Sequence, residues 1–393
     1  MRVLLLTLSL ALAGLFGVRA APPTYSPELN ARVFDKAWRT VQDRYWNQRL
    51  LGEHWADIRD HYRARILAAP DRRTLYTLLG EMLAQLGDSH VYAIDPVQVA
   101  IGRARDKGDA MGGFGVTLLP DDDGIWRVKA TRPGGPAARA GVEIGWELRS
   151  VDGQPFDIDF QPRDGQAARM HFIDEDGRAH DLTLAAVMEQ GEPVRRARML
   201  PGGLLLIGLD SFDPGADRWM RDAIADHAPR GLILDLRDND GGDADVIARV
   251  AGLFFAENRL LVRRLGKRET DQMTHGAGAT SWSGPLAVLI GPDSASGAEA
   301  VAALIDESGR GPTIGQRTAG ALTGAGLYRL PDGGQLSVAE FDIRTAGGAR
   351  LEGVGLMPRI PVTPTLAQRR AGQDPALEKA KALLARPNLA AKE

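Results

Sequence analysis

The sequence predicts an α/β protein that begins with a helical region. Two segments each read as an apolar strand, a glycine-containing turn and a helix: residues 231–236 lead into 244–255, and residues 285–290 lead into 298–305. In residues 26–86, by contrast, apolar side chains recur at helical spacing. Strand–turn–helix units that follow one another are typical of α/β folds.

The amino terminus has the pattern of an export signal. A basic Arg2 is followed by an apolar stretch, residues 3–18, and then by the small-x-small triplet that ends at Ala20. We predict a signal peptide, residues 1–20, cleaved after Ala20, with export to a bacterial periplasm and no membrane span afterwards. An uncleaved membrane anchor is the alternative. No cysteine is available for a lipid anchor, a disulfide or thiolate chemistry.

Composition narrows the possible functions of the 393-residue chain. Its formal net charge of −3 and lack of a basic run argue against a nucleic-acid binder. The acidic runs at 121–123 and 238–243 read as turns and lack a set of metal ligands. We therefore expect no metal and no other cofactor. The oligomeric state cannot be inferred from the sequence.

A histidine stands where the helical region ends. Gly87 and Asp88 stop the last predicted helix, and Ser89 and His90 precede an extended segment. A lone histidine is usually a satisfied core or surface residue, which is the simpler interpretation of His90. His275, in a glycine-rich loop, is a weaker candidate for a functional role.

Residues 111–188 form a compact unit that resembles a PDZ domain. The run GPAARAGV, the strand WELRSV and the turn DGQPF follow in that family's order. The resemblance implies a loop whose backbone N–H groups bind the carboxylate of a peptide C-terminus. That loop would be Gly113, Phe114, Gly115 and Val116. The unit could instead be a spacer or a lid.

Both strand–turn–helix units carry residues suited to acyl chemistry. Ser294 and Ser296 stand before a helix, where unpaired N–H groups and the helix dipole favour an anionic nucleophile. The paired Gly241 and Gly242 let a backbone approach a ligand closely, and their N–H groups could hold an oxyanion. The simpler interpretations are a serine N-cap and a tight turn before a helix.

Taken together, the motifs resemble those of the C-terminal processing (tail-specific) protease and tricorn core family of serine peptidases. The helical start, the PDZ-like unit and the runs LILDLRDNDGG, GPDSASGAEA, IGQRTAGA and LEGVGLMP occur in the family's order over nearly the whole mature chain. The resemblance implies a helical region at 21–108, an inserted PDZ domain at 109–190 and a crotonase-like (ClpP/crotonase-type) α/β peptidase core at 191–393.

The family uses two kinds of general base, and the sequence fits one of them. The C-terminal processing branch pairs its serine, which falls on Ser296, with a lysine, but Ala321 occupies the lysine position and cannot accept a proton. The tricorn branch uses a Ser–His pair assisted by a second serine and a glutamate. By resemblance these are His90, Ser89 and Glu352, with oxyanion donors at Gly297 and at Gly241 or Gly242. Glu352 either polarises the base or positions substrate.

We therefore predict an exported serine peptidase that cleaves proteins or peptides through a Ser296 acyl-enzyme, with His90 as general base. The alternative is a catalytically inactive binding protein that captures peptide C-termini or an apolar ligand. A third possibility is a PDZ adaptor for a partner enzyme. The complete set of Ser296, His90 and Glu352 favours the peptidase.

Overall fold

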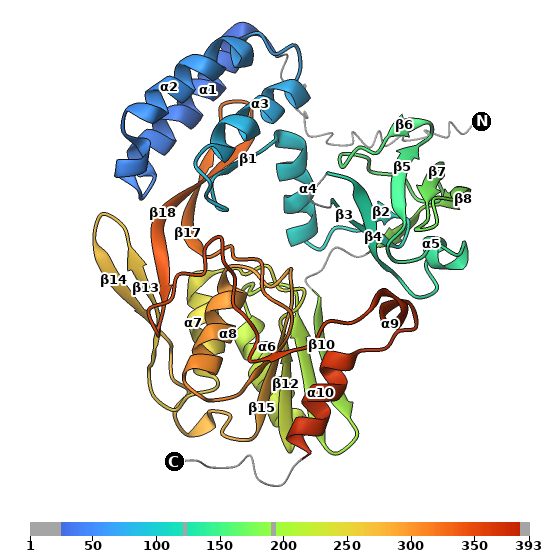
Figure 1. The fold of residues 1–393 in the computed structure, drawn as a ribbon, viewed down its shortest axis with the longest axis vertical. Coiled ribbons are helices and arrows are strands. Elements are labelled where there is room, and N and C mark those ends of the chain that lie inside the picture. Colours follow the sequence, from blue (N-terminus) through green and yellow to red (C-terminus); the bar gives the residue numbers. More distant parts are fainter. Residues whose placement is uncertain (1–24, 121–123, 190–193, 386–393) are drawn as a thin grey trace, which may run out of the picture.

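The computed structural model describes residues 25–120, 124–189 and 194–385 (Figure 1). The predicted signal peptide at 1–20 and the acidic run at 121–123 lie outside these residues. Among the described residues, no helix has the length and apolar character needed to cross a bilayer.

The helical region is held together by an apolar core. It shares this core with a hairpin that lies far away in the sequence but packs against the helices. Val33, Trp55 and Leu79 pack in one cluster with Leu336 and Val338, which lie in β18. Asp71 and Asp95 cap helices by accepting backbone N–H groups of the first turn. The elements of this region are α1 (Pro27–Arg44), α2 (Gln48–Leu67), α3 (Arg72–Ala84), β1 (Tyr92–Ile94) and α4 (Pro96–Asp106).

A β domain follows, with its own core around Trp146 and Phe172. Its main sheet has the order β3-β4-β5-β7-β8, with β6 paired to β5, while β2 and β9 form a separate pair. The bounds are β2 (Met111–Gly113), β3 (Val116–Pro120), β4 (Trp126–Thr131), α5 (Pro136–Arg139), β5 (Glu147–Val151), β6 (Gln154–Pro155), β7 (Ala167–Ile173), β8 (Ala179–Ala185) and β9 (Val187–Glu189).

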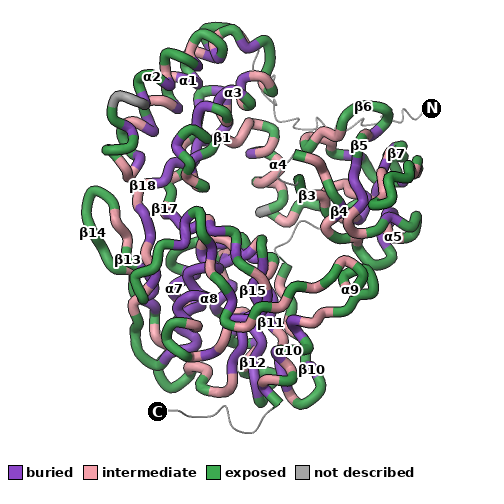
Figure 2. The backbone as a smooth tube through the Cα atoms, in the orientation of Figure 1, coloured by how far each residue is buried: buried purple, intermediate pink, exposed green. Residues whose placement is uncertain are grey.

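The α/β core is built on a sheet of order β10-β11-β12-β15-β16-β19, in which only β10 runs antiparallel to its neighbour. Alternate residues of the central strands face opposite sides. Leu234 and Val288 pack with α6, α7 and α8, whereas Ile233 and Ala287 pack with α10. Figure 2 shows this buried interior.

The strands of this sheet are β10 (Arg195–Leu200), β11 (Leu204–Leu209), β12 (Gly231–Asp235), β15 (Leu286–Ile290), β16 (Thr313–Gly315) and β19 (Ile360–Pro361). The helices around it are α6 (Ala216–His227), α7 (Ala244–Gly252), α8 (Gly297–Glu307) and α10 (Pro375–Leu384), with a 3₁₀ turn η1 (Gly278–Thr280). The short α9 (Leu366–Arg370) instead contacts the β domain, where Arg370 pairs with Glu143 and Glu175.

A second sheet joins the core to the helical region. Its order is β1-β18-β13-β14, and β17 pairs with β18. The β17–β18 hairpin extends from the core up to the helices (Figure 1). Its strands are β13 (Leu260–Leu265), β14 (Glu269–Met273), β17 (Thr323–Arg329) and β18 (Gln335–Thr345).

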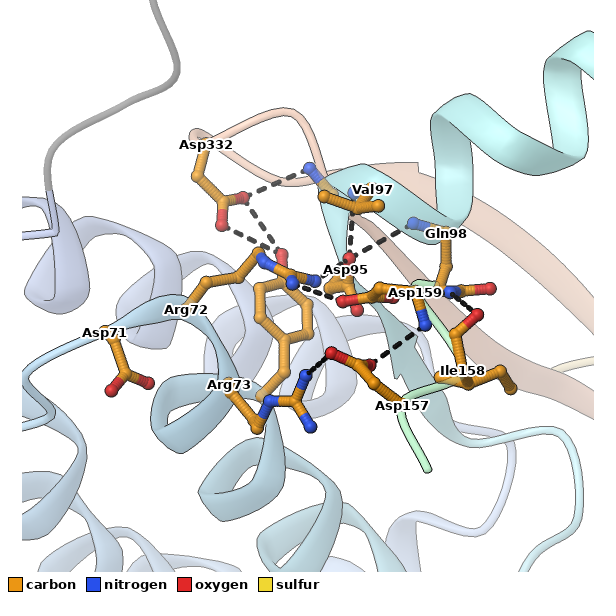
Figure 3. Close-up of polar contacts among 12 residues, drawn as sticks. Asp71, Arg72, Arg73, Asp95, Val97, Gln98, Asp157, Ile158, Asp159 and Asp332 are labelled. Atoms are coloured by element: carbon orange, nitrogen blue, oxygen red, sulfur yellow. Dashed lines mark hydrogen bonds and ion pairs between the residues drawn. The ribbon is translucent and has the colours of Figure 1, made fainter. Parts of the chain in front are cut away.

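Ion pairs dock the β domain on its neighbours. On the helical side, Arg72 pairs with Asp95 and with Asp159 of the β domain (Figure 3). On the core side, Lys129 of β4 lies 3.1 Å from Asp238 and 2.6 Å from Asp293. These two aspartates belong to the loops that follow β12 and β15.

Candidate active site

The turn after β15 gives its two serines different roles. Ser294 is buried; its Oγ donates to the Leu236 carbonyl at 2.7 Å and accepts from the Gly291 amide at 3.0 Å. Ser296 begins α8 with φ 53° and ψ −116°, far from the extended backbone of an ordinary N-cap. Such a backbone costs about 1–3 kcal/mol and persists only where its surroundings enforce it. Ser294 therefore stabilises the turn through its own hydrogen bonds, and the turn leaves Ser296 partly exposed.

A buried glutamate that the sequence analysis did not identify enforces that backbone. Glu299 accepts from the Ser296 amide at 3.1 Å, from the Thr318 hydroxyl at 2.5 Å, and from the amides of Gly320 and Ala321 at 2.9 and 2.8 Å. Burial raises the pKa of Glu299, and these four donors oppose that rise. The S-x-x-E spacing of a capping box was the signal that could have revealed it.

Ala321 takes part in the site through its backbone. Besides its amide bond to Glu299, its carbonyl accepts the Ser296 amide at 2.8 Å. Its side chain is a methyl group, and no lysine lines the cavity that holds Ser296 in the part of the chain that the structure describes.

A chain of hydrogen bonds supports His90. His90 Nδ1 lies 2.9 Å from Ser89 Oγ, and Ser89 Oγ donates to Glu352 Oε2 at 3.0 Å. Because the Ser89 proton goes to Glu352, Nδ1 carries the hydrogen that Ser89 Oγ accepts, and Nε2 is left with its lone pair. Glu352, only 3 % exposed, also accepts from the amides of Ser89 and Leu322 at 2.8 and 2.7 Å.

The turn that carries His90 is fixed by Asp88. Asp88 Oδ1 accepts from the His90 amide at 3.1 Å and from Thr323 Oγ1 at 3.0 Å, and Oδ2 accepts from the Trp46 indole at 3.1 Å. The His90 carbonyl accepts from Ser337 at 2.7 Å. Burial lowers the pKa of His90 below 6.5, and the charges of Glu352 and Asp88 only partly offset this. The imidazole is therefore neutral at neutral pH.

One cavity of about 530 Å³ contains both Ser296 and His90. It lies at the carboxyl edge of the parallel strands, where α/β sheets usually bind ligands. Gly242 and Gly297 also line it. Apolar walls come from β13, β18, α7, α8 and the loop before β17: Ile247, Leu261, Val262, Ala300, Leu322, Phe341 and Ile343.

Gly241 and Gly242 differ in what surrounds them. The Gly241 amide donates to Asn239 Oδ1 at 3.0 Å, so that donor is already used. A Cβ at Gly241 would lie 2.8 Å from Ser296 Cβ and 3.0 Å from the Gly297 nitrogen. Gly241 thus provides the space beside the serine, and Gly242 is the glycine of this pair that lines the cavity.

The loop predicted to bind a peptide C-terminus lies in the β domain, and none of its residues lines this cavity. Gly113 ends β2 and Val116 begins β3. Between them the Phe114 ring stacks on Phe160 at 6.2 Å between centroids, and Gly115 has φ +69°. His275, the competing histidine, does not line the cavity either.

Comparison with known proteins gives matches over both the helical region and the core. Residues 203–362 match the model of peptidase family S41, and residues 27–84 match that of the tricorn protease C1 domain. Tricorn protease homolog 1 of Streptomyces coelicolor is 27 % identical over 90 % of this chain, which spans 35 % of that protein. A carboxyl-terminal-processing protease of Picosynechococcus sp. is 25 % identical over 90 % of this chain and 88 % of its own length.

Solved structures give the same fold. The photosystem II D1 C-terminal processing protease has a TM-score of 0.63 and 23 % identity, covering 91 % of this chain and 98 % of its own. The tricorn protease has a TM-score of 0.57 and 18 % identity, covering 91 % of this chain and 37 % of its own.

The fold and these matches define a peptidase of mixed α/β architecture, which acts on peptides or proteins. These matches support the C-terminal processing and tricorn family of serine peptidases, which the motifs of the sequence indicated. The matches do not favour the binding-only alternative.

Proposed function

We propose that the chain is an exported peptidase in which Ser296 attacks the scissile carbonyl and His90 is the general base. The observation that carries this proposal is the hydrogen-bonded series from His90 Nδ1 through Ser89 Oγ to Glu352. It leaves Nε2 as the basic nitrogen of a residue that shares a cavity with Ser296.

In the first step His90 Nε2 takes the Ser296 proton as Oγ bonds to the carbonyl carbon. The resulting imidazolium is stabilised by Glu352 through Ser89. It then gives its proton to the leaving amine, and the acyl-enzyme forms. In the second half of the cycle His90 takes a proton from a water molecule as the water oxygen bonds to the acyl carbon, and it returns that proton to Ser296 Oγ as the acyl group leaves. Glu352 acts as a positioning and electrostatic residue in this scheme.

Two amides are proposed to hold the oxyanion: those of Gly297, at the N-terminus of α8, and Gly242, at the cavity wall. We assign the second position to Gly242 rather than Gly241 because Asn239 already accepts the Gly241 N–H. Gly241 instead has no side chain, and this leaves room beside Ser296 for the reacting groups.

The β domain is proposed to be a PDZ domain, residues 109–190, inserted between the helical region at 21–108 and a crotonase-like core at 191–393. Its loop of Gly113, Phe114, Gly115 and Val116 would bind substrate C-termini through backbone N–H groups. The carbonyls of Phe114 and Gly115 accept from Ala137 and Arg132, which fixes the loop's shape.

Export to a periplasm is proposed from the sequence of residues 1–20. Amino-terminal sequencing of the protein recovered after expression of the full chain tests it. We expect Ala21 as the first residue; a protein that retains Met1 would overturn it.

Labelling with a fluorophosphonate, which reacts with activated serines, tests the proposed chemistry. We expect one label, mapped to Ser296 by peptide mass spectrometry and lost in Ser296→Ala and His90→Ala. His275→Ala is the matched control and should label as the wild type does. A label that persists in His90→Ala would reject His90 as the base.

A further inference from the structure

A cationic side chain, Arg264, shares the cavity with Ser296 and His90. Arg264 lies on β13, opposite Ile343 of β18 and Thr270 of β14. Val262, Ile343 and Phe341 form an apolar wall beside it, and Gln272 is a polar neighbour in the same cavity. Charge in an apolar wall of an active-site cavity is costly unless a partner offsets it.

The guanidinium has an incomplete set of partners. One Nη donates to Gln272 Oε1, and the group lies 5.0 Å over the Phe341 ring. Its Nε is buried without a hydrogen-bond acceptor. Within residues 25–120, 124–189 and 194–385 no ion pair joins Arg264 to a carboxylate, and Asp245 attracts it only at longer range.

Two other arginines of the core have the acceptors that Arg264 lacks. Arg263, the preceding residue, pairs with Glu269 and Asp271. Arg310, which is also desolvated, donates to the carbonyls of Phe254, Trp282 and Gly284. Arg264 has neither arrangement, and burial lowers its pKa. Arg63 and Arg195 also have a buried Nε without an acceptor, but neither of them lines the cavity that holds Ser296.

Gln272 holds the guanidinium in place. While Gln272 Oε1 accepts from Arg264, its amide nitrogen donates to the Ala244 carbonyl at 2.8 Å, at the start of α7. The cation is thus oriented before any ligand arrives, which lowers the entropy cost of binding. Two carboxylates also line the cavity, those of Asp240 and Asp243. They lie in the loop before α7, and neither forms an ion pair with Arg264.

We propose that Arg264 binds a carboxylate of the substrate, and that the enzyme thereby selects peptides that place such a group in the cavity beside Ser296. A planar guanidinium suits a two-point contact with a carboxylate, and Arg264 is partly exposed and has no carboxylate partner among the described residues. Two sources share this chemistry: an acidic side chain next to the scissile bond, and the C-terminal carboxylate of a chain cut near its end. The selection rests on the proposed peptidase function.

Matched fluorogenic peptides separate the two sources. One pair differs only in Glu or Gln beside the scissile bond; a second pair ends in a free carboxylate or an amide. We expect wild-type kcat/KM to favour the charged member of at least one pair by tenfold or more. Which pair shows the preference identifies the source.

Arg264→Met should remove that preference while the neutral peptide is still cut. Arg264→Lys keeps the charge without the fork and should give an intermediate preference, which guards against a folding defect in the first variant. Arg263→Met is the control and should keep the preference. Equal rates within both pairs in the wild type, or a preference that survives Arg264→Met, would overturn the proposal.

Binding to the Ser296→Ala protein keeps this proposal separate from the proposed function. Fluorescence anisotropy with the same peptides should show the charge preference and its loss when Arg264→Met is added. Preferential binding without any cleavage by the wild type would reject the peptidase chemistry but support the carboxylate site. Cleavage by the wild type without a charge preference would support the peptidase chemistry and reject the carboxylate site.

Discussion

At the scale of single residues, the site depends on a histidine whose proton is directed by its neighbours. Glu352 accepts two backbone amides as well as the Ser89 hydroxyl, so its position is fixed independently of His90. Because Ser89 Oγ stands between them, Glu352 influences His90 without touching it. This arrangement makes the pH dependence of activity informative.

Glu352→Gln should move the acid limb of the kcat/KM profile to lower pH. The base works when neutral, so activity is present above the pKa of His90 and is lost as pH falls through it. Burial lowers that pKa below 6.5 in the wild type, while Glu352 raises it in part. Removing the carboxylate removes that rise and should also reduce kcat by at least about tenfold.

The pH profile of the variant, measured with one fluorogenic peptide, checks this. Glu257→Gln changes an exposed glutamate and should leave the limb where it is. An acid limb that moves to higher pH in Glu352→Gln would contradict the electrostatic role of Glu352.

The residues around the site differ in how far the sequence could predict them. Ser89, His90, Ser296 and Glu352 were predicted from motifs, and the structure places the first two with Glu352 in one hydrogen-bonded series. Arg264 was not predicted, because its proposed role depends on the absence of a carboxylate partner among its neighbours in the fold. That property depends on packing between β13, β14 and α7, which no local pattern encodes.

At the scale of elements, strand–turn–helix units bring the reacting groups together. The turn after β12 carries Gly241, the turn after β15 carries Ser296, and both open on the same edge of the parallel sheet. The sequence predicted both units because strand and helix periods differ and glycine marks the break. It could not predict how closely the two turns approach.

Gly241→Ala should reduce kcat/KM by about 100-fold or more, comparable with loss of an oxyanion donor. The added Cβ would lie 2.8 Å from Ser296 Cβ and 3.0 Å from the Gly297 nitrogen, at a residue with φ +108°. The same φ strain costs stability by about 1–3 kcal/mol.

Gly309→Ala is a control that adds backbone strain without crowding the active site. Gly309 has φ +71°, but no atom lies within 4 Å of the place that its Cβ would take. This control should lose some stability and keep its kcat/KM. Thermal unfolding and steady-state rates on both variants make the comparison. A Gly241→Ala enzyme with normal rates would show that the approach of the two turns is unimportant.

At the scale of the whole molecule, the β domain is attached on two sides. Arg72 lies between Asp95 and Asp159, and Lys129 lies between Asp238 and Asp293 (Figure 3 shows the first group). The second group connects the β domain to both loops that lead into the active site. These contacts span long sequence distances between charged residues, so composition and periodicity could not predict them.

Arg72→Met should lower the free energy of unfolding by about 1.5–3 kcal/mol, because it removes charge-assisted hydrogen bonds to two partly buried carboxylates. The Arg72, Asp95 and Asp159 side chains are 23 %, 17 % and 14 % exposed. Arg73→Met is a matched control: Arg73 pairs with Asp157 at the surface, and its loss should cost at most about 1 kcal/mol. Urea unfolding measures both, and equal effects would contradict a buried docking network.

The measurement that tests the central claim most directly is the kcat/KM of His90→Ala with a peptide that the wild type cleaves. We predict a loss of about 1,000-fold or more with the thermal unfolding midpoint little changed, since His90 is proposed to move both protons of the reaction. A folded His90→Ala enzyme with the wild-type rate would contradict the account and require a different base for Ser296.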